Sequence, residues 1–261
     1  MVRKILFFTG LCMCIAANAV ASITTETVEY TAKDGVTMEG YVAYDDAITT
    51  ARPAILIVHD WMGLAPFDKD KAELLAKQGY VAMAVDVYGK GARPANTEEA
   101  KKLATKYKDN RALLRSHMQA AYDRLIAMKA VDNKKIVVMG YCFGGTAALE
   151  LARNGAPLVG TVTFHGGLSN PTAADAKNIK GRVLVLHGAN DPFVPPAEVQ
   201  AFRTEMRNAG VDTTIIFYPG AVHAFTNPAA GNDNSKGAAY NAVADKASWE
   251  AFEQFLKAVS H

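Results

Sequence analysis

Cysteine is scarce in this chain of 261 residues, which contains only three. Cys12 and Cys14 lie close to the N-terminus, and Cys142 is the one cysteine in the rest of the chain. If the first 21 residues are removed as a leader, as predicted below, a single thiol remains, and it excludes an internal disulfide. In an oxidising compartment a lone thiol is a liability, so its presence requires either deep burial or a chemical role.

An excess of charge of one sign is also absent. Lys and Arg number 28 against 26 Asp and Glu, and hydrophobic residues make up 50% of the chain. No long basic stripe alternates with aromatic residues, so neither nucleic acid nor an anionic membrane surface is expected as a partner. We expect a monomer that acts on a small molecule, with no metal, no cofactor and no membrane contact in its mature form.

Long hydrophobic runs are missing except at the N-terminus. There a basic start, Val2-Arg3-Lys4, precedes a mostly apolar run over 5–17 and the small-residue site Ala19-Val20-Ala21. This order is typical of a signal peptide (residues 1–21), so we predict cleavage after Ala21 and an exported protein, periplasmic or secreted. The alternative is an uncleaved anchor, but the run is shorter than the roughly 20 residues that span a bilayer. The remainder, 22–261, is predicted to form a single catalytic domain.

The chain after the leader alternates between strand and helix patterns. Two β-rich runs, 25–30 and 36–44, flank Lys33-Asp34-Gly35 and predict an antiparallel hairpin. Further expected strands are 54–58, 81–85, 136–139, 158–164, 183–186 and 213–218, and the expected helices are 69–77, 97–107, 110–129, 143–153, 196–208 and 242–259. The alternation predicts an α/β fold with a mostly parallel central sheet flanked by helices on both faces.

One segment combines an apolar strand, a glycine-rich turn and a helix of small residues. Its turn reads Gly140-Tyr141-Cys142-Phe143-Gly144-Gly145, which fits a nucleophile elbow. Glycines two positions before and after the nucleophile relieve the steric conflict of so sharp a turn. At a helix N-terminus the backbone amides favour the thiolate of Cys142. The alternative is a buried cysteine beside glycines that only permit close helix–strand packing.

A nucleophile elbow requires an acid and then a histidine later in the chain. Asp191 follows the expected strand 183–186, and His223 follows 213–218 and a Pro-Gly turn. We therefore predict a Cys142–Asp191–His223 triad in which His223 accepts the thiol proton and Asp191 fixes the imidazole tautomer. Taken alone, Asp191 before a proline also fits a turn residue. His165 and His187, at expected strand ends, are interpreted as structural.

Acyl transfer also needs donors for the oxyanion of the tetrahedral intermediate. The backbone N–H groups of Phe143 and of Trp61, after the strand 54–58, are the predicted donors.

From about Ala54 to the C-terminus the sequence resembles the dienelactone hydrolase family of the α/β-hydrolase superfamily. The motifs that carry the resemblance are G-Y-C-F-G-G, G-A-N-D-P and P-G-A-V-H-A-F, in this order. The resemblance implies an α/β-hydrolase fold and a cysteine hydrolase of lactones or small esters, with the triad named above. It also implies an acidic residue that influences the resting thiol, here Asp60; a solvated loop carboxylate is the alternative reading.

The sequence departs from the family where an anionic substrate would be held. Tyr88, Lys90 and Asn227 are the candidates for substrate binding, but Lys90 and Asn227 stand where arginines are expected. Lysine offers no planar bidentate fork and asparagine no charge, so dienelactone itself is not the expected substrate.

Three other functions remain open at this point. The protein could be a hydrolase of the same fold that cleaves a peptide or an acylated carbohydrate. It could be a non-catalytic protein that uses a decayed site for binding. It could also be a redox sensor that uses its single thiol, although the mature chain has no second cysteine to form an internal disulfide with it.

Overall fold

The structure is a computed structural model that describes residues 22–260. The predicted signal peptide therefore lies outside the described residues. The strands are β1 (Ile23–Thr31), β2 (Thr37–Asp45), β3 (Arg52–Val58), β4 (Val81–Val85), β5 (Val131–Tyr141), β6 (Gly160–Phe164), β7 (Arg182–Gly188) and β8 (Thr213–Tyr218). The helices are α1 (Pro66–Lys77), α2 (Thr97–Asp109), α3 (Arg111–Ile126), α4 (Phe143–Arg153), α5 (Pro196–Ala209) and α6 (Ala242–Ser260), with short 3-10 turns η1 (Ala173–Asn178), η2 (Pro228–Ala230) and η3 (Asn234–Lys236).

The eight strands form one sheet in the order β1-β2-β4-β3-β5-β6-β7-β8. β1 pairs antiparallel with β2, and β2 antiparallel with β4. From β4 to β8 every neighbouring pair is parallel. Because parallel strands end at the same edge, the segments that follow β3, β5, β7 and β8 meet there.

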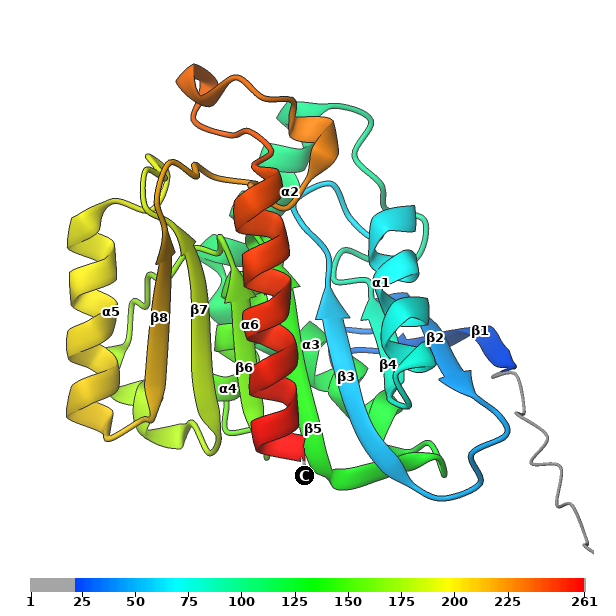
Figure 1. Cartoon of the computed structure of the whole chain (residues 1–261). Coiled ribbons are helices and arrows are strands. Elements are labelled where there is room, and N and C mark those ends of the chain that lie inside the picture. The colour runs from blue at the N-terminus through cyan, green and yellow to red at the C-terminus, as the bar shows by residue number, and fades with distance from the viewer. Residues whose placement is uncertain (1–21, 261) are drawn as a thin grey trace, which may run out of the picture.

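Helices cover both faces of the sheet (Figure 1). α1 and α6 share one hydrophobic core with one side of the strands. α3, α4 and α5 share the other core with the opposite side. β4, and β3 from Ala54 onward, are unbroken apolar runs, since both of their faces are buried. The predicted fold class, a mostly parallel α/β sheet with an N-terminal antiparallel pair, is confirmed.

Element bounds agree with the sequence patterns apart from short extensions and truncations. β4, β8 and α4 have the predicted limits. α1 begins three residues earlier than predicted, at Pro66, because proline is tolerated at the first helical position and the Asp68 carboxylate accepts a hydrogen bond from Ala65 N–H at 2.9 Å. β5 begins earlier than expected, at Val131, which pairs with Arg52 across a register shift.

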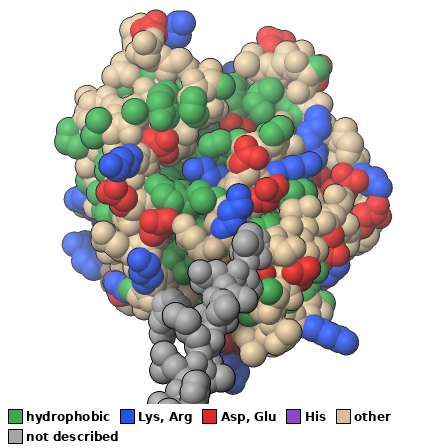
Figure 2. All heavy atoms as spheres, turned by 45° about the vertical axis from the view of Figure 1, so that its right-hand side comes forward, with side chains coloured by type: hydrophobic (Ala, Val, Ile, Leu, Met, Phe, Trp, Pro, Cys, Tyr) green, Lys and Arg blue, Asp and Glu red, His purple; other side chains and the backbone are tan. Residues whose placement is uncertain are grey.

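The surface carries both signs of charge. On the face shown in Figure 2, acidic and basic side chains are interspersed among apolar ones. Between residues 22 and 260 no helix is sufficiently long and apolar to cross a bilayer.

Candidate active site

The turn between β5 and α4 holds Cys142 in an uncommon backbone conformation. Its φ of 52° and ψ of −113° lie in a region that L-residues rarely adopt. The turn is tight enough that a methyl group on Gly140 would lie 2.1 Å from the carbonyl oxygen of Gly144. Glycine is therefore required at position 140, and the sharp turn leaves the Cys142 side chain partly exposed.

The structure brings the three predicted triad side chains together. His223 Nε2 lies 3.0 Å from Cys142 Sγ, and His223 Nδ1 lies 2.8 Å from Asp191 Oδ2. The second carboxylate oxygen of Asp191 accepts a hydrogen bond from Phe193 N–H at 2.8 Å. His223 is itself anchored, because its backbone N–H donates to Gly237 O at 3.1 Å. Backbone groups of neighbouring loops thus hold Asp191 and His223 in place.

The charges of these groups favour a protonated imidazole. Burial alone would lower the pKa of His223, but the negative charge of the Cys142 sulfur and the hydrogen bond to Asp191 raise it to about 10. With a pKa of about 10, the imidazole of His223 carries a proton at neutral pH.

The two predicted oxyanion donors lie at the same end of the sheet. A methyl group on Gly144 would lie 2.2 Å from Val58 O and 2.5 Å from His59 O, so α4 begins in direct contact with the end of β3. Phe143 is the first residue of α4, where a backbone N–H has no acceptor within the helix. In the described part of the chain, the Trp61 N–H has no hydrogen-bond acceptor either.

The Asp60 carboxylate has a hydrogen-bond partner within its own loop, and its influence on the thiol stays a prediction. The carboxylate accepts a hydrogen bond from Met62 N–H at 2.7 Å. Burial raises the pKa of Asp60, and the positive charge of His223 opposes this shift. Within residues 22–260 no hydrogen bond joins this carboxylate to Cys142.

Two of the three candidate substrate-binding residues have other partners. The ammonium group of Lys90 is half-exposed and pairs with Glu29 and, at 3.3 Å, with Glu39. The side-chain oxygen of Asn227 accepts a hydrogen bond from Ala229 N–H at 2.9 Å and caps η2. Lys90 and Asn227 thus have partners within the protein, and their assignment to substrate binding stays a prediction.

Tyr88, the third candidate, is nearly buried beside the oxyanion loop. Its hydroxyl donates to Trp61 O at 3.1 Å, and its ring centroid lies 5.3 Å from that of Phe143. Burial, followed by the negative charge of Cys142, raises the pKa of Tyr88. Tyr88 therefore supports the loop as a hydrogen-bond donor.

Two further groups beside the site, His59 and Arg93, are not predicted by the motifs. His59 directly follows β3, and its Nε2 accepts a hydrogen bond from Val87 N–H at 3.1 Å. Arg93 donates to Leu64 O at 3.2 Å and to Asp86 Oδ1 at 3.3 Å, which ties together the loops after β3 and β4. For His59 the only signal in the sequence is that a polar residue follows an apolar run.

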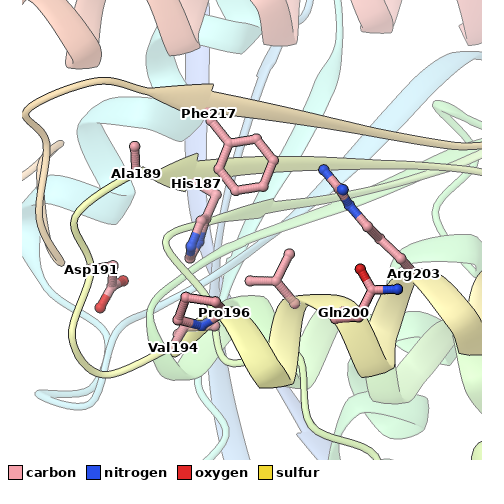
Figure 3. A pocket seen from close by; sticks show the side chains of 9 residues that line it. His187, Ala189, Asp191, Val194, Pro196, Gln200, Arg203 and Phe217 are labelled. Carbon is pink, nitrogen blue, oxygen red and sulfur yellow. The ribbon is translucent and has the colours of Figure 1, made fainter.

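His165 and His187, interpreted as structural from the sequence, both lie near the triad. His165 is buried, its Nε2 lies 2.8 Å from Thr226 Oγ1, and its ring lies edge-on to His223 at 5.1 Å. His187 lines a cavity of about 230 Å³ behind the Asp191 loop (Figure 3). The other residues lining this cavity are Ala189, Asp191, Val194, Pro196, Val199, Gln200, Arg203 and Phe217. No cluster of metal-ligating side chains occurs among the described residues.

The sequence profile of the dienelactone hydrolase family matches residues 38–260. The chain belongs to this family. A relative from Aquifex aeolicus with the provisional name carboxymethylenebutenolidase is 32% identical over 199 residues, 75% of this chain and 84% of its own length. Its family membership identifies the present chain as a hydrolase acting on ester or lactone bonds.

Two solved structures resemble this dienelactone hydrolase family member closely. One, named m3DLH, has a TM-score of 0.87 and 35% identity and covers 92% of this chain and 99% of its own. The other is a dienelactone hydrolase-like promiscuous phosphotriesterase from metagenomic libraries, with a TM-score of 0.87 and 37% identity over 93% of this chain and 100% of its own.

Proposed function

We propose that this family member hydrolyses small, uncharged esters or lactones with Cys142 as nucleophile, His223 as general acid and base, and Asp191 as the group that orients His223. The observation that carries the proposal is the position of His223, 3.0 Å from the Cys142 sulfur and 2.8 Å from the Asp191 carboxylate. This is the geometry of a nucleophile, its base and an orienting acid.

The reaction follows from these positions. The Cys142 thiolate attacks the carbonyl carbon, and the resulting oxyanion is stabilised by the Phe143 and Trp61 N–H groups. The C–O bond breaks as His223 gives its proton to the leaving alkoxide, which leaves a thioester on Cys142. His223, now neutral, takes a proton from water, whose oxygen attacks the thioester. The C–S bond then breaks, which releases the acid and restores the thiolate and the protonated imidazole.

The preference for an uncharged substrate is supported by the fact that Lys90 and Arg93 already have partners within the protein. Lys90 is paired with two glutamates, and Arg93 is engaged by Asp86 and a backbone carbonyl. On the other side, the Phe193 ring is 58% exposed and lies 5.4 Å from His223, edge-on. An apolar wall beside the base favours an apolar acyl or alcohol group over a carboxylate.

A panel of p-nitrophenyl esters and lactones, neutral and anionic, tests this proposal before and after stoichiometric alkylation with iodoacetamide. We expect neutral esters to turn over faster, and alkylation or Cys142→Ala to abolish turnover in a folded protein. Lys90→Ala should change KM for neutral and anionic substrates alike. Undiminished hydrolysis by the alkylated protein would exclude Cys142 as the nucleophile.

A second candidate reaction is phosphotriester hydrolysis, favoured by the 37% identical structure described as a promiscuous phosphotriesterase. Adding a p-nitrophenyl phosphotriester to the same panel distinguishes it. We further propose that the protein is exported without residues 1–21 and functions as a monomer.

A further inference from the structure

The peptide that joins Asp60 to Trp61 is held by its carbonyl group. Its oxygen accepts one hydrogen bond from the Nδ1 of His59 and another from Gly63 N–H at 3.3 Å. The peptide is trans, so its N–H points away from its carbonyl oxygen. Whatever fixes the Asp60 carbonyl therefore also fixes the direction of the Trp61 N–H.

His59 is itself held in one orientation and one tautomer. Its Nε2 accepts from Val87 N–H at 3.1 Å, so the ring proton resides on Nδ1, which faces the Asp60 carbonyl. The side chain is fully buried, and burial lowers the pKa of His59 to about 4. A neutral imidazole with this tautomer is a permanent donor at neutral pH.

The same ring also stacks on the side chain of Phe143, the residue whose backbone N–H is the other proposed oxyanion donor. The His59 ring stacks on the Phe143 ring with centroids 5.9 Å apart and an interplanar angle of 21°. The His59 and Tyr88 rings form a T-shaped pair with centroids 4.8 Å apart. One buried imidazole therefore touches both the peptide of Trp61 and the side chain of Phe143.

We propose that His59 is a positioning residue for oxyanion stabilisation: its Nδ1–H aims and polarises the Asp60–Trp61 peptide, so that the Trp61 N–H faces the developing negative charge. This inference rests on the proposed function, in which that N–H is an oxyanion donor. Donors that are oriented before the reaction need no reorganisation at the transition state. A polarised carbonyl also strengthens the N–H of the same peptide as a donor.

Two substitutions separate the two nitrogen atoms of His59. In His59→Asn the amide nitrogen occupies the place of Nδ1 and still donates to the Asp60 carbonyl. In His59→Gln the amide oxygen reaches the place of Nε2 and still accepts from Val87, but nothing replaces Nδ1. A structural role in the core would be served comparably by either amide.

The two readouts are ester turnover and the rate of Cys142 alkylation by iodoacetamide. Alkylation displaces iodide at a saturated carbon and forms no oxyanion, so it reports the thiolate alone. We expect His59→Gln to lower kcat for p-nitrophenyl acetate about 100-fold, the size of a lost oxyanion donor, and His59→Asn to lower it less than about tenfold. The alkylation rate should stay near the wild-type value in both.

Equal losses in the two variants, a normal kcat in His59→Gln, or alkylation that slows in step with turnover would overturn the role of His59. Failure of the proposed function has a different signature, namely turnover by alkylated wild-type protein. If thermal unfolding shows that His59→Gln does not fold, the wild type supplies the test. The Nδ1 proton resonance of His59 should shift when a substrate-like aldehyde forms a hemithioacetal on Cys142, and an unchanged resonance would refute the inference.

Discussion

At the scale of single residues, the charge state of His223 has consequences for stability. Its pKa of about 10 in the folded protein lies above the ordinary value of 6.5. The protonated ring therefore contributes stability that is fully present below pH 6.5 and lost as the pH rises towards 10. We expect urea denaturation between pH 6 and pH 10 to show this loss in the wild type, and a smaller loss in Cys142→Ala, which lacks the negative sulfur.

The same proton predicts the pH dependence of thiol reactivity. A protonated His223 lies 3.0 Å from the sulfur and favours the thiolate, so alkylation of Cys142 should depend less steeply on pH between 7 and 9 than alkylation of His223→Ala. In His223→Ala this positive charge is lost, so the alkylation rate should be lower at pH 7 and rise more over this range. Stopped-flow alkylation measures both profiles, and a wild-type profile as steep as that of the variant would contradict this influence of His223.

At the scale of elements, the contact between α4 and β3 depends on Gly144. An added methyl group would meet the Val58 carbonyl at 2.2 Å, and a backbone atom cannot move aside alone. We expect Gly144→Ala to destabilise the protein by about 1–3 kcal/mol and to reduce turnover, because α4 carries the Phe143 N–H. Gly167→Ala is the matched control: its nearest neighbour is the Thr146 hydroxyl at 3.1 Å, so denaturation should show a smaller loss.

A buried ion network fixes α4 to α5. Arg153 is fully buried, donates to both carboxylate oxygens of Glu205 at 2.9 Å and contacts Glu150 at 3.1 Å. Arg153→Met should cost about 3–5 kcal/mol, because it leaves the buried Glu205 carboxylate without a counter-charge, whereas Glu150 keeps its pair with Arg115. Arg182→Met removes an exposed pair with Asp212 and should cost about 0–1 kcal/mol by the same denaturation measurement. Equal losses of unfolding free energy in the two variants would contradict the larger contribution of the buried network.

The elements also show what the sequence can and cannot predict. Strand and helix periodicity gives the sheet, and the linear order of Cys142, Asp191 and His223 gives a cluster that the structure assembles. Lys90 could not be placed in this way, because its glutamate partners lie directly opposite each other on β1 and β2, a consequence of hairpin register. His59 is missed because its role depends on a tautomer set by Val87, 28 residues later in the chain.

At the scale of the whole molecule, the single thiol makes the leader prediction measurable. Cleavage after Ala21 removes Cys12 and Cys14, so the exported protein should begin at Ser22 and contain one cysteine. Intact mass combined with thiol titration in denaturant checks both expectations. Three titratable thiols and a mass that begins at Met1 would contradict cleavage.

The separation of the reacting groups along the chain bears on how the protein is made. His223 follows Cys142 by 81 residues and is fixed in place only after β8 has joined the sheet. During synthesis the nascent chain therefore carries a thiol whose activating base has not yet left the ribosome. The nucleophile gains its base with the last part of the fold, so alkylation should be faster in completed, folded chains than in incomplete ones.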